Sequence, residues 1–189
     1  MDKLIIEGSA RLVGEVETSG AKNSALPLMA ATLLCKGTHQ LRNVPHLKDI
    51  ETFKKLLTHH GSKIEENSGI LTFESSAIDN LEAPYDLVKT MRAAILVLGP
   101  LAGRFKEARV SLPGGCAIGE RPVNLHIEAL EKMGAEIEIT DGYINLKTTG
   151  LKGAHLYFEN QTVTGTENLM LAAVLAKGTT TIENAALEP

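Results

Sequence analysis

One cysteine stands in a segment whose composition is suited to exposing a reactive thiol. Cys116 belongs to the run Leu-Pro-Gly-Gly-Cys-Ala-Ile-Gly-Glu-Arg-Pro at residues 112–122, which joins a predicted strand to a predicted helix. The glycines and prolines predict a mobile loop, and the positive charge of Arg121 favours the thiolate form of the cysteine. We therefore expect Cys116 to act as a nucleophile or a proton donor, and the alternative is an unreactive loop thiol.

Basic residues stand near the predicted starts of three helices, where unpaired backbone N–H groups and the helix dipole attract anions. Lys22 precedes the first helix, Arg92 lies near the start of a second, and Arg121 directly precedes a third. Lys22 and Arg92 are 70 residues apart, so they occupy equivalent places in two copies of a repeat. Brought together, these cations would bind a phosphate or a carboxylate, and the alternative is three unrelated surface cations.

The other polar residues predict no metal or cofactor site. Adjacent His59 and His60 face different directions on a helix, and no second cysteine lies near Cys116. Neither a Walker loop nor a dinucleotide-binding glycine motif is present. Cys35 follows two leucines at the end of a predicted helix and is expected in the core. We therefore expect chemistry that needs no metal and no organic cofactor.

Composition and charge narrow the classes of partner. The chain has 189 residues, of which 43% are hydrophobic and 22% charged, and its net charge is −4. This balance gives no long-range attraction to nucleic acid or to an anionic membrane, and the longest apolar stretch, residues 93–103, is about half the length of a membrane span. No signal peptide is evident, and two cysteines without paired spacing indicate a reducing compartment. These features predict a cytoplasmic protein that binds neither nucleic acid nor membrane.

An internal repeat organises the chain. Residues 23–44 and 164–185 superpose without gaps, 141 positions apart, and each contains a small-residue helix, a Lys-Gly-Thr turn and a strand that ends at asparagine. A looser copy at residues 91–112 lies midway, which gives a period near 70 residues. A left-handed glycine cap is expected to end the helix of each copy, at Gly37, Gly103 and Gly178.

Second helices and hairpins complete the first two copies. Helices are predicted over about 47–60 and 122–133 from their apolar positions, which are Ile50, Phe53 and Leu57 in the first and Leu130 and Met133 in the second. Asn-Ser-Gly at 67–69 and Asp-Gly at 141–142 predict hairpin turns. The unit is therefore strand-helix-strand-helix-strand-strand. The third unit stops at Pro189 before its second helix, which indicates a fragment or a domain that other sequence completes.

Motifs spread over the whole chain resemble the UDP-N-acetylglucosamine 1-carboxyvinyltransferase family. They occupy residues 19–27, 91–93, 112–119, 121–126, 164–170 and 183–185. The resemblance implies an inside-out α/β barrel of three such repeats, with helices at the centre and sheets outside. It also implies a second domain that is mostly missing here. Residues 1–20 would supply strands to that domain, and residues 21–189 would form the first domain, incomplete at its C-terminal end.

The resemblance also implies a reaction. Enzymes of this family transfer the enolpyruvyl group of phosphoenolpyruvate to the 3-hydroxyl of UDP-N-acetylglucosamine and release phosphate. This is the first committed step of peptidoglycan synthesis, so the enzyme would serve cell-wall biogenesis, cell shape, the cell cycle and cell division. The cysteine matched by Cys116 is the one that fosfomycin alkylates. The implied protein is a cytoplasmic transferase whose only partners are its two substrates and its own second domain.

Individual residues are assigned by the same resemblance. Lys22 contacts phosphoenolpyruvate and helps to protonate it, Cys116 is the proton donor, and Arg121 lies near the reacting phosphate. Asn23 helps to hold the site. The nucleotide sugar is contacted by a larger set, which consists of Arg92, Arg121, Pro122, Val123, Asn124, Leu125, Asn160, Gln161, Thr162 and Val163. Lysine is familiar in the family at the place of Asn160, so one phosphate contact departs from the pattern.

Two alternatives remain open at this stage. The related 3-phosphoshikimate enolpyruvyl transferases share the fold and phosphoenolpyruvate, but the Gly-Gly-Cys loop argues against them. In the family, the aspartate base and the arginines that bind the phosphoenolpyruvate carboxylate belong to the missing half. We therefore expect these 189 residues alone to be inactive. The second alternative is a non-catalytic fragment that binds nucleotide sugar or serves only as a structural domain.

Overall fold

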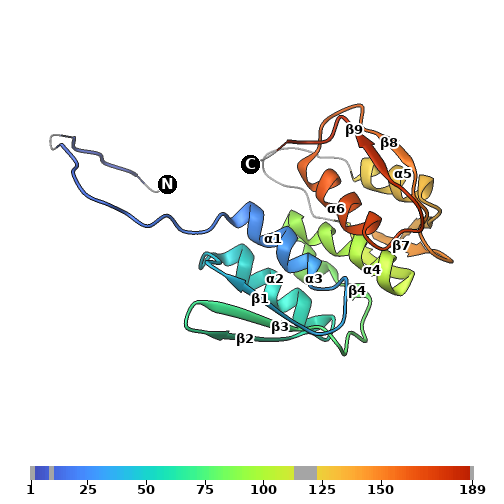
Figure 1. Cartoon of the computed structure of the whole chain (residues 1–189), viewed down its shortest axis with the longest axis horizontal. Helices are drawn as coiled ribbons and strands as arrows, with labels where there is room; N and C mark the ends of the chain where they lie inside the picture. Colours follow the sequence, from blue (N-terminus) through green and yellow to red (C-terminus); the bar gives the residue numbers. More distant parts are fainter. Residues whose placement is uncertain (1–2, 9–10, 113–122, 188–189) are drawn as a thin grey trace.

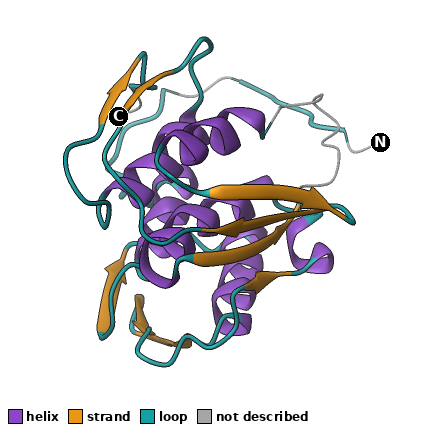
Figure 2. Cartoon of the chain, turned by 90° about the vertical axis from the view of Figure 1, so that its right-hand side faces the viewer, coloured by secondary structure: helices purple, strands orange, loops and turns teal. Residues whose placement is uncertain are grey.

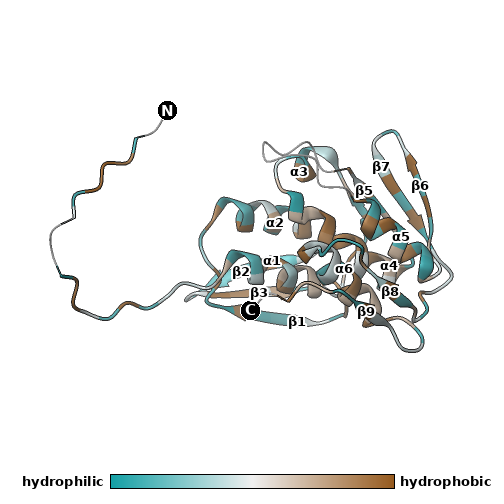
Figure 3. Cartoon of the chain, turned by 90° about the horizontal axis from the view of Figure 1, so that it is seen from above, coloured by the Kyte–Doolittle hydropathy of each residue, from teal (hydrophilic) through white to brown (hydrophobic). Residues whose placement is uncertain are grey.

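The N-terminal segment extends away from the rest of the chain (Figure 1). The computed structural model describes residues 3–8, 11–112 and 123–187, and the described residues before Gly20 form neither helix nor strand. Their large apolar side chains are exposed, and these are Leu4, Ile5, Ile6, Leu12, Val13 and Val16. Hydrophobic and hydrophilic residues alternate along this segment in Figure 3. Apolar side chains gathered on an exposed segment are typical of a surface that packs against another surface.

The first repeat consists of two helices and an antiparallel sheet. Its elements are α1 (Lys22–Ala31), β1 (Thr38–Arg42), α2 (Lys48–His59), β2 (Lys63–Asn67) and β3 (Ile70–Glu74). The sheet has the order β1-β3-β2. Ile50, Phe53 and Leu57 on α2 are all buried, which confirms the predicted apolar face of this helix.

The second repeat contains the whole predicted unit. Its elements are β4 (Glu82–Ala83), α3 (Tyr85–Val88), the 3-10 helix η1 (Arg92–Val97), α4 (Leu98–Phe105), β5 (Glu107–Ser111), α5 (Asn124–Lys132), β6 (Glu136–Thr140) and β7 (Tyr143–Lys147). The sheet has the order β4-β5-β7-β6, in which β4 and β5 are parallel and the other pairs antiparallel. Leu130 and Met133 are fully buried, as predicted.

The third repeat begins as the second one does. Its described elements are β8 (His155–Tyr157), α6 (Val163–Ala173) and β9 (Thr181–Glu183). Strands β8 and β9 pair in parallel, as β4 and β5 do. Helix α6 packs against η1, α4 and α5, so the third repeat shares the core of the second.

Backbone conformation confirms the internal repeat. Asn43 and Asn184, which are 141 positions apart, both adopt a positive φ, of 54° and 52°. Both hairpins have two residues of positive φ at their turns, as type I′ turns require, namely Ser68, Gly69, Asp141 and Gly142. Gly37 and Gly178 also share a positive φ, of 118° and 101°. The prediction that they end their helices was wrong, because α1 and α6 end at Ala31 and Ala173, with right-handed caps at Thr32 and Val174.

The core is mainly aliphatic and lies among the helices. In Figure 2 the helices occupy the middle of the molecule and the strands lie around them. Side chains from all three repeats meet there, and fully buried examples are Met29, Leu33, Phe53, Leu101 and Leu169. This arrangement, with helices inside and sheets outside, is the inside-out α/β architecture that the family resemblance predicted.

Two further local predictions were wrong. Cys35 is exposed and lies beyond α1, because the chain turns after Ala31 and Arg104 binds the carbonyl oxygens of Leu33 and Cys35 at 2.8 and 3.1 Å. Gly103 does not end its helix. Helix α4 continues to Phe105, and the left-handed cap is Lys106, with φ 65°. A Cβ at Gly103 would lie 3.4 Å from the Cβ of Leu175, so this glycine instead lies close to the segment that follows α6.

Candidate functional site

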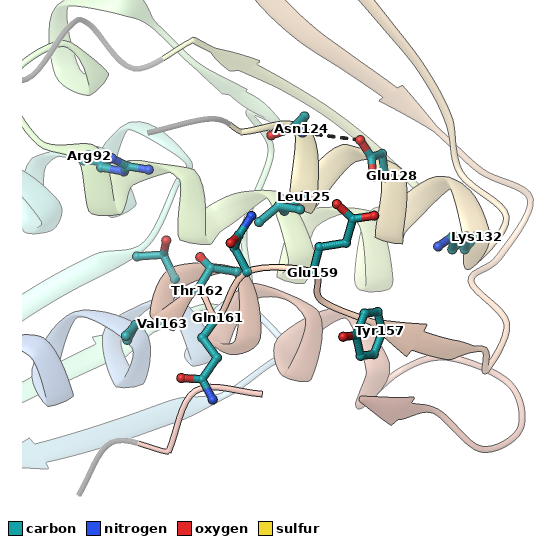
Figure 4. Close-up of a pocket in the computed structure, with 12 residues that line it drawn as sticks. Arg92, Asn124, Leu125, Glu128, Lys132, Tyr157, Glu159, Gln161, Thr162 and Val163 are labelled. Carbon is teal, nitrogen blue, oxygen red and sulfur yellow. Dashed lines mark hydrogen bonds between the residues drawn. The ribbon is translucent and has the colours of Figure 1, made fainter. Parts of the chain in front are cut away.

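A cavity of about 740 Å³ opens where α5 and α6 begin (Figure 4). It is lined by side chains from η1, α5, the end of β8, the β8–α6 loop and the start of α6. They are Arg92, Asn124, Leu125, Glu128, Lys132, Tyr157, Glu159, Asn160, Gln161, Thr162, Val163 and Thr164. A volume of this size lies within the range of ordinary small-molecule sites.

One wall of the cavity is a face of α5. Asn124, Glu128 and Lys132 recur every four residues and therefore lie on one side of the helix, all three exposed. The Nδ2 atom of Asn124 donates to the Oε1 atom of Glu128 at 3.4 Å. Leu125 adds an apolar surface beside them. This wall therefore offers an amide, a carboxylate, an ammonium group and a hydrocarbon side chain.

The opposite wall is the approach to α6. Thr162 is the N-cap of this helix, and its Oγ1 accepts a hydrogen bond from the backbone N–H of Gly165 at 3.1 Å. The 11-residue helix begins at Val163, which lines the cavity. Backbone N–H groups in a first helical turn, together with the helix dipole, favour an anionic ligand. The start of α6 therefore adds positive potential to this wall.

Charged side chains are distributed along the cavity. In Figure 4 the cations Arg92 and Lys132 lie at opposite ends, and the carboxylates of Glu128 and Glu159 lie between them. Glu128 and Glu159 are exposed and can accept hydrogen bonds from hydroxyl or amide groups of a ligand. The arrangement suits a ligand that carries both anionic and hydrogen-bond-donating groups.

The structure brings together seven of the residues that the resemblance assigned to the nucleotide sugar, and these are Arg92, Asn124, Leu125, Asn160, Gln161, Thr162 and Val163. Val123 directly precedes α5 and is its N-cap. Cys116, Arg121 and Pro122 lie outside the described residues. The part of the predicted site around Cys116 therefore lies outside the described residues.

Lys22 and Asn23 do not line this cavity. Lys22 is the first residue of α1, and its Nζ donates to Oδ2 of Asp49 in the first turn of α2 at 2.8 Å. Both side chains of this ion pair are partly exposed, 39% and 36%. The pair joins the starts of two neighbouring helices, and α1 also packs against η1, which carries Arg92.

Five lining residues escaped the sequence analysis, and these are Glu128, Lys132, Tyr157, Glu159 and Thr164. The spacing of Glu128 and Lys132 from Asn124, four and eight residues along one helix face, was a signal that could have found two of them. Glu159 directly precedes the assigned run 160–163 and Tyr157 lies three residues before it, but their own residue types carry no such signal.

Within the ranges that the structure covers, no group of three or more His, Cys, Asp or Glu side chains is arranged to hold a metal ion. Among the helices described, none combines the length and hydrophobicity that crossing a membrane requires.

Comparison with known proteins identifies the class to which this chain belongs. The family model of EPSP synthase (3-phosphoshikimate 1-carboxyvinyltransferase) matches residues 6–189. The chain therefore belongs to this family of enolpyruvyl transferases. In solved structures, the enolpyruvyl transferase NikO from Streptomyces tendae superposes with a TM-score of 0.79 at 23% identity, over 96% of this chain and 43% of that one. The enolpyruvyl transferase fold is confirmed.

Sequence relatives point to one branch of the family. The chain is 54% identical to a UDP-N-acetylglucosamine 1-carboxyvinyltransferase of Geotalea uraniireducens and 58% identical to one of Thermodesulfovibrio yellowstonii. Each alignment covers all 189 residues of this chain. The chain spans 45% of the length of each of these relatives and corresponds to their N-terminal portion.

Proposed function

We propose that this chain is the nucleotide-sugar-binding part of a UDP-N-acetylglucosamine 1-carboxyvinyltransferase. The complete enzyme would transfer the enolpyruvyl group of phosphoenolpyruvate to the 3-hydroxyl of the sugar and release phosphate, as the first committed step of peptidoglycan synthesis. The observation that carries the proposal is that seven residues assigned to the nucleotide sugar from sequence line one cavity. They come from three segments that are distant in the chain.

The chemistry of the cavity supports a nucleotide sugar as its ligand. Arg92 and the first turn of α6 provide positive charge and N–H donors for a diphosphate. Leu125 and Tyr157 provide flat or apolar contacts, and Glu128 and Glu159 provide acceptors for hydroxyl or amide groups. Asn160 contributes a neutral amide where a lysine is familiar, so the phosphates would depend more on Arg92 in this chain.

The transfer itself would be done by Lys22, Cys116 and Arg121. In the proposed reaction, the sugar oxygen attacks C2 of phosphoenolpyruvate and gives up its proton to a base on the second domain, while Cys116 protonates C3. Loss of a C3 proton and departure of phosphate then restore the double bond. Lys22 and Arg121 would stabilise the negative charge of the tetrahedral intermediate. Lys22 would exchange its partner Asp49 for the substrate phosphate, and no metal or organic cofactor takes part.

The proposed enzyme has a second domain. Residues 1–20 would pair with that domain, which accounts for the exposed apolar side chains of the N-terminal segment, and residues 21–189 would form the first domain. The proposed enzyme is a cytoplasmic transferase needed for cell-wall biogenesis, cell shape and cell division. Fosfomycin would inactivate it by alkylating Cys116. Neither nucleic acid nor membrane would be a partner.

Phosphate release with two acceptors tests the proposed reaction. The chain would be joined to the C-terminal portion of the Geotalea uraniireducens relative, and the chimera incubated with phosphoenolpyruvate and one acceptor. We expect phosphate release with UDP-N-acetylglucosamine and none with shikimate 3-phosphate. The 189-residue chain by itself should release none, because the second domain supplies the base. Release with shikimate 3-phosphate alone would favour the sister activity, and turnover by the isolated chain would contradict the two-domain account.

A further inference from the structure

A buried polar network connects three helices behind the cavity. The Nδ2 atom of Asn168 on α6 lies 3.0 Å from Nδ1 of His126 on α5, and the backbone N–H of Gly99 on α4 donates to Oδ1 of Asn168 at 2.7 Å. Asn168 and His126 are 0% and 1% exposed. Buried polar groups of this kind are costly unless each has a partner, so the three groups depend on one another.

The network fixes the tautomer of the histidine. The Gly99 N–H can only donate, so the amide atom of Asn168 that receives it must be the oxygen. The other amide atom is then the NH₂ group, which can only donate to Nδ1 of His126. That ring nitrogen therefore carries no proton, and the neutral imidazole has its hydrogen on Nε2.

Burial and a nearby positive charge both favour this neutral state. Burial, and to a lesser extent the positive charge of Arg92, lowers the pKa of His126 to about 4. This pKa is below the ordinary value of about 6.5 that His126 has in the unfolded chain. The contribution of the neutral histidine to stability is therefore fully present above about pH 6.5. This stabilisation is lost as the pH falls toward 4. At neutral pH His126 therefore places no second cation beside Arg92.

His126 and Asn168 lie on the two helices that form the walls of the cavity. His126 directly follows Asn124 and Leu125, which form the α5 wall, and Asn168 lies on the helix whose start forms the opposite wall. Gly99 anchors the pair to α4, which continues from the 3-10 helix that begins at Arg92. The hydrogen bonds thus link the segments that carry both walls and the arginine.

We propose that His126 and Asn168 are positioning residues for the nucleotide-sugar cavity, and that the Nε2–H tautomer of His126 holds the starts of α5 and α6 at the spacing the ligand requires. This inference rests on the proposed function for its ligand. The tautomer and the hydrogen-bonded link are properties of the chain alone. A side chain that restores an acceptor at position 126 should therefore restore binding, and one that does not should weaken it.

Nitrogen NMR of His126 in the 189-residue chain tests the first half of this proposal. We expect the ¹⁵N shifts of a neutral Nε2–H imidazole at pH 7, with Nδ1 unprotonated. In Asn168→Asp, a carboxylate oxygen would face Nδ1, and the expected result is a ring protonated at Nδ1 at the same pH. A proton on Nδ1 in the unsubstituted chain would overturn the tautomer assignment, and so would an unchanged imidazole in Asn168→Asp.

Calorimetric titration with UDP-N-acetylglucosamine tests the second half. His126→Leu leaves the Asn168 NH₂ group without an acceptor and should weaken binding about tenfold, the scale of one lost buried hydrogen bond. His126→Gln offers an amide oxygen and should recover most of that loss. The matched control is Leu130→Ala, one turn further along α5 and fully buried, which should lower stability while the folded protein keeps its affinity.

The outcomes separate the two proposals. Equal affinity losses in His126→Leu, His126→Gln and Leu130→Ala would show a merely structural role and overturn the positioning role. If the unsubstituted chain binds no nucleotide sugar, the proposed function fails, and the ligand half of this inference fails with it. If His126→Leu does not fold, the comparison of His126→Gln with Leu130→Ala and the tautomer measurement still decide the matter.

Discussion

Replacing Lys22 with methionine in the two-domain chimera is expected to lower kcat/KM for phosphoenolpyruvate by about 100- to 1000-fold, the scale of losing one preorganised group that stabilises transition-state charge. The ammonium group stands at the first residue of α1, where the helix dipole adds to its own positive charge. Methionine keeps the length of the side chain and removes the charge. Steady-state phosphate release at saturating UDP-N-acetylglucosamine measures the effect.

Lys55→Met is the matched control for this prediction. Lys55 is exposed on α2, the helix that carries the Lys22 partner Asp49, and it does not line the cavity. Its substitution removes the same charge from the same part of the molecule and should leave kcat/KM within about twofold, because exposed surface charges contribute little. Similar losses in both variants would mean that net charge, rather than a substrate contact of Lys22, is responsible.

Replacing Gly99 with alanine is expected to lower the free energy of unfolding by about 3 kcal/mol or more. A Cβ at this position would lie 2.3 Å from the backbone oxygen of Asn168 and 2.6 Å from its Oδ1 atom. Both atoms belong to α6, so α4 and α6 would have to separate. The Gly99 N–H···Oδ1 bond would stretch as they did so. Denaturant unfolding followed by circular dichroism measures the change as a shift in the midpoint.

Gly103→Ala provides the control within the same helix. Gly103 lies one turn further along α4, and its added Cβ would meet the Cβ of Leu175 at 3.4 Å, an ordinary contact. Alanine is favoured over glycine inside helices by roughly 0.5–1 kcal/mol, so this variant should be neutral or slightly more stable. If Gly99→Ala were as stable as Gly103→Ala, the close crossing of α4 and α6 would not exist as described.

The repeat architecture could be predicted from sequence because it depends on local signals. Turn pairs such as Asp141-Gly142 require positive φ, and the structure has it there. The apolar faces of the second helices followed from spacing alone. Cys35 was misplaced because consecutive leucines continue a helical pattern. The exposure of its thiol depends on Arg104, which reaches the same loop from another repeat.

The cavity could be predicted only in part. The run at 160–163 was found through a family resemblance, and its convergence with residues 124 and 125 requires the three-dimensional packing of α5 against α6. Whether Lys132 and Glu159 face a ligand depends on the spacing of those helices. That spacing is linked to buried contacts such as His126–Asn168, which are 42 residues apart in the chain, and no local pattern reveals such a pair.

The most direct test of the central claim is a calorimetric titration of the 189-residue chain with UDP-N-acetylglucosamine. The account predicts saturable one-to-one binding, weakened about tenfold or more in Arg92→Ala because a charged hydrogen-bonding partner of the diphosphate is removed. Shikimate 3-phosphate should give no binding. An absence of binding, or an affinity that Arg92→Ala leaves unchanged, would contradict the assignment of this cavity to the nucleotide sugar.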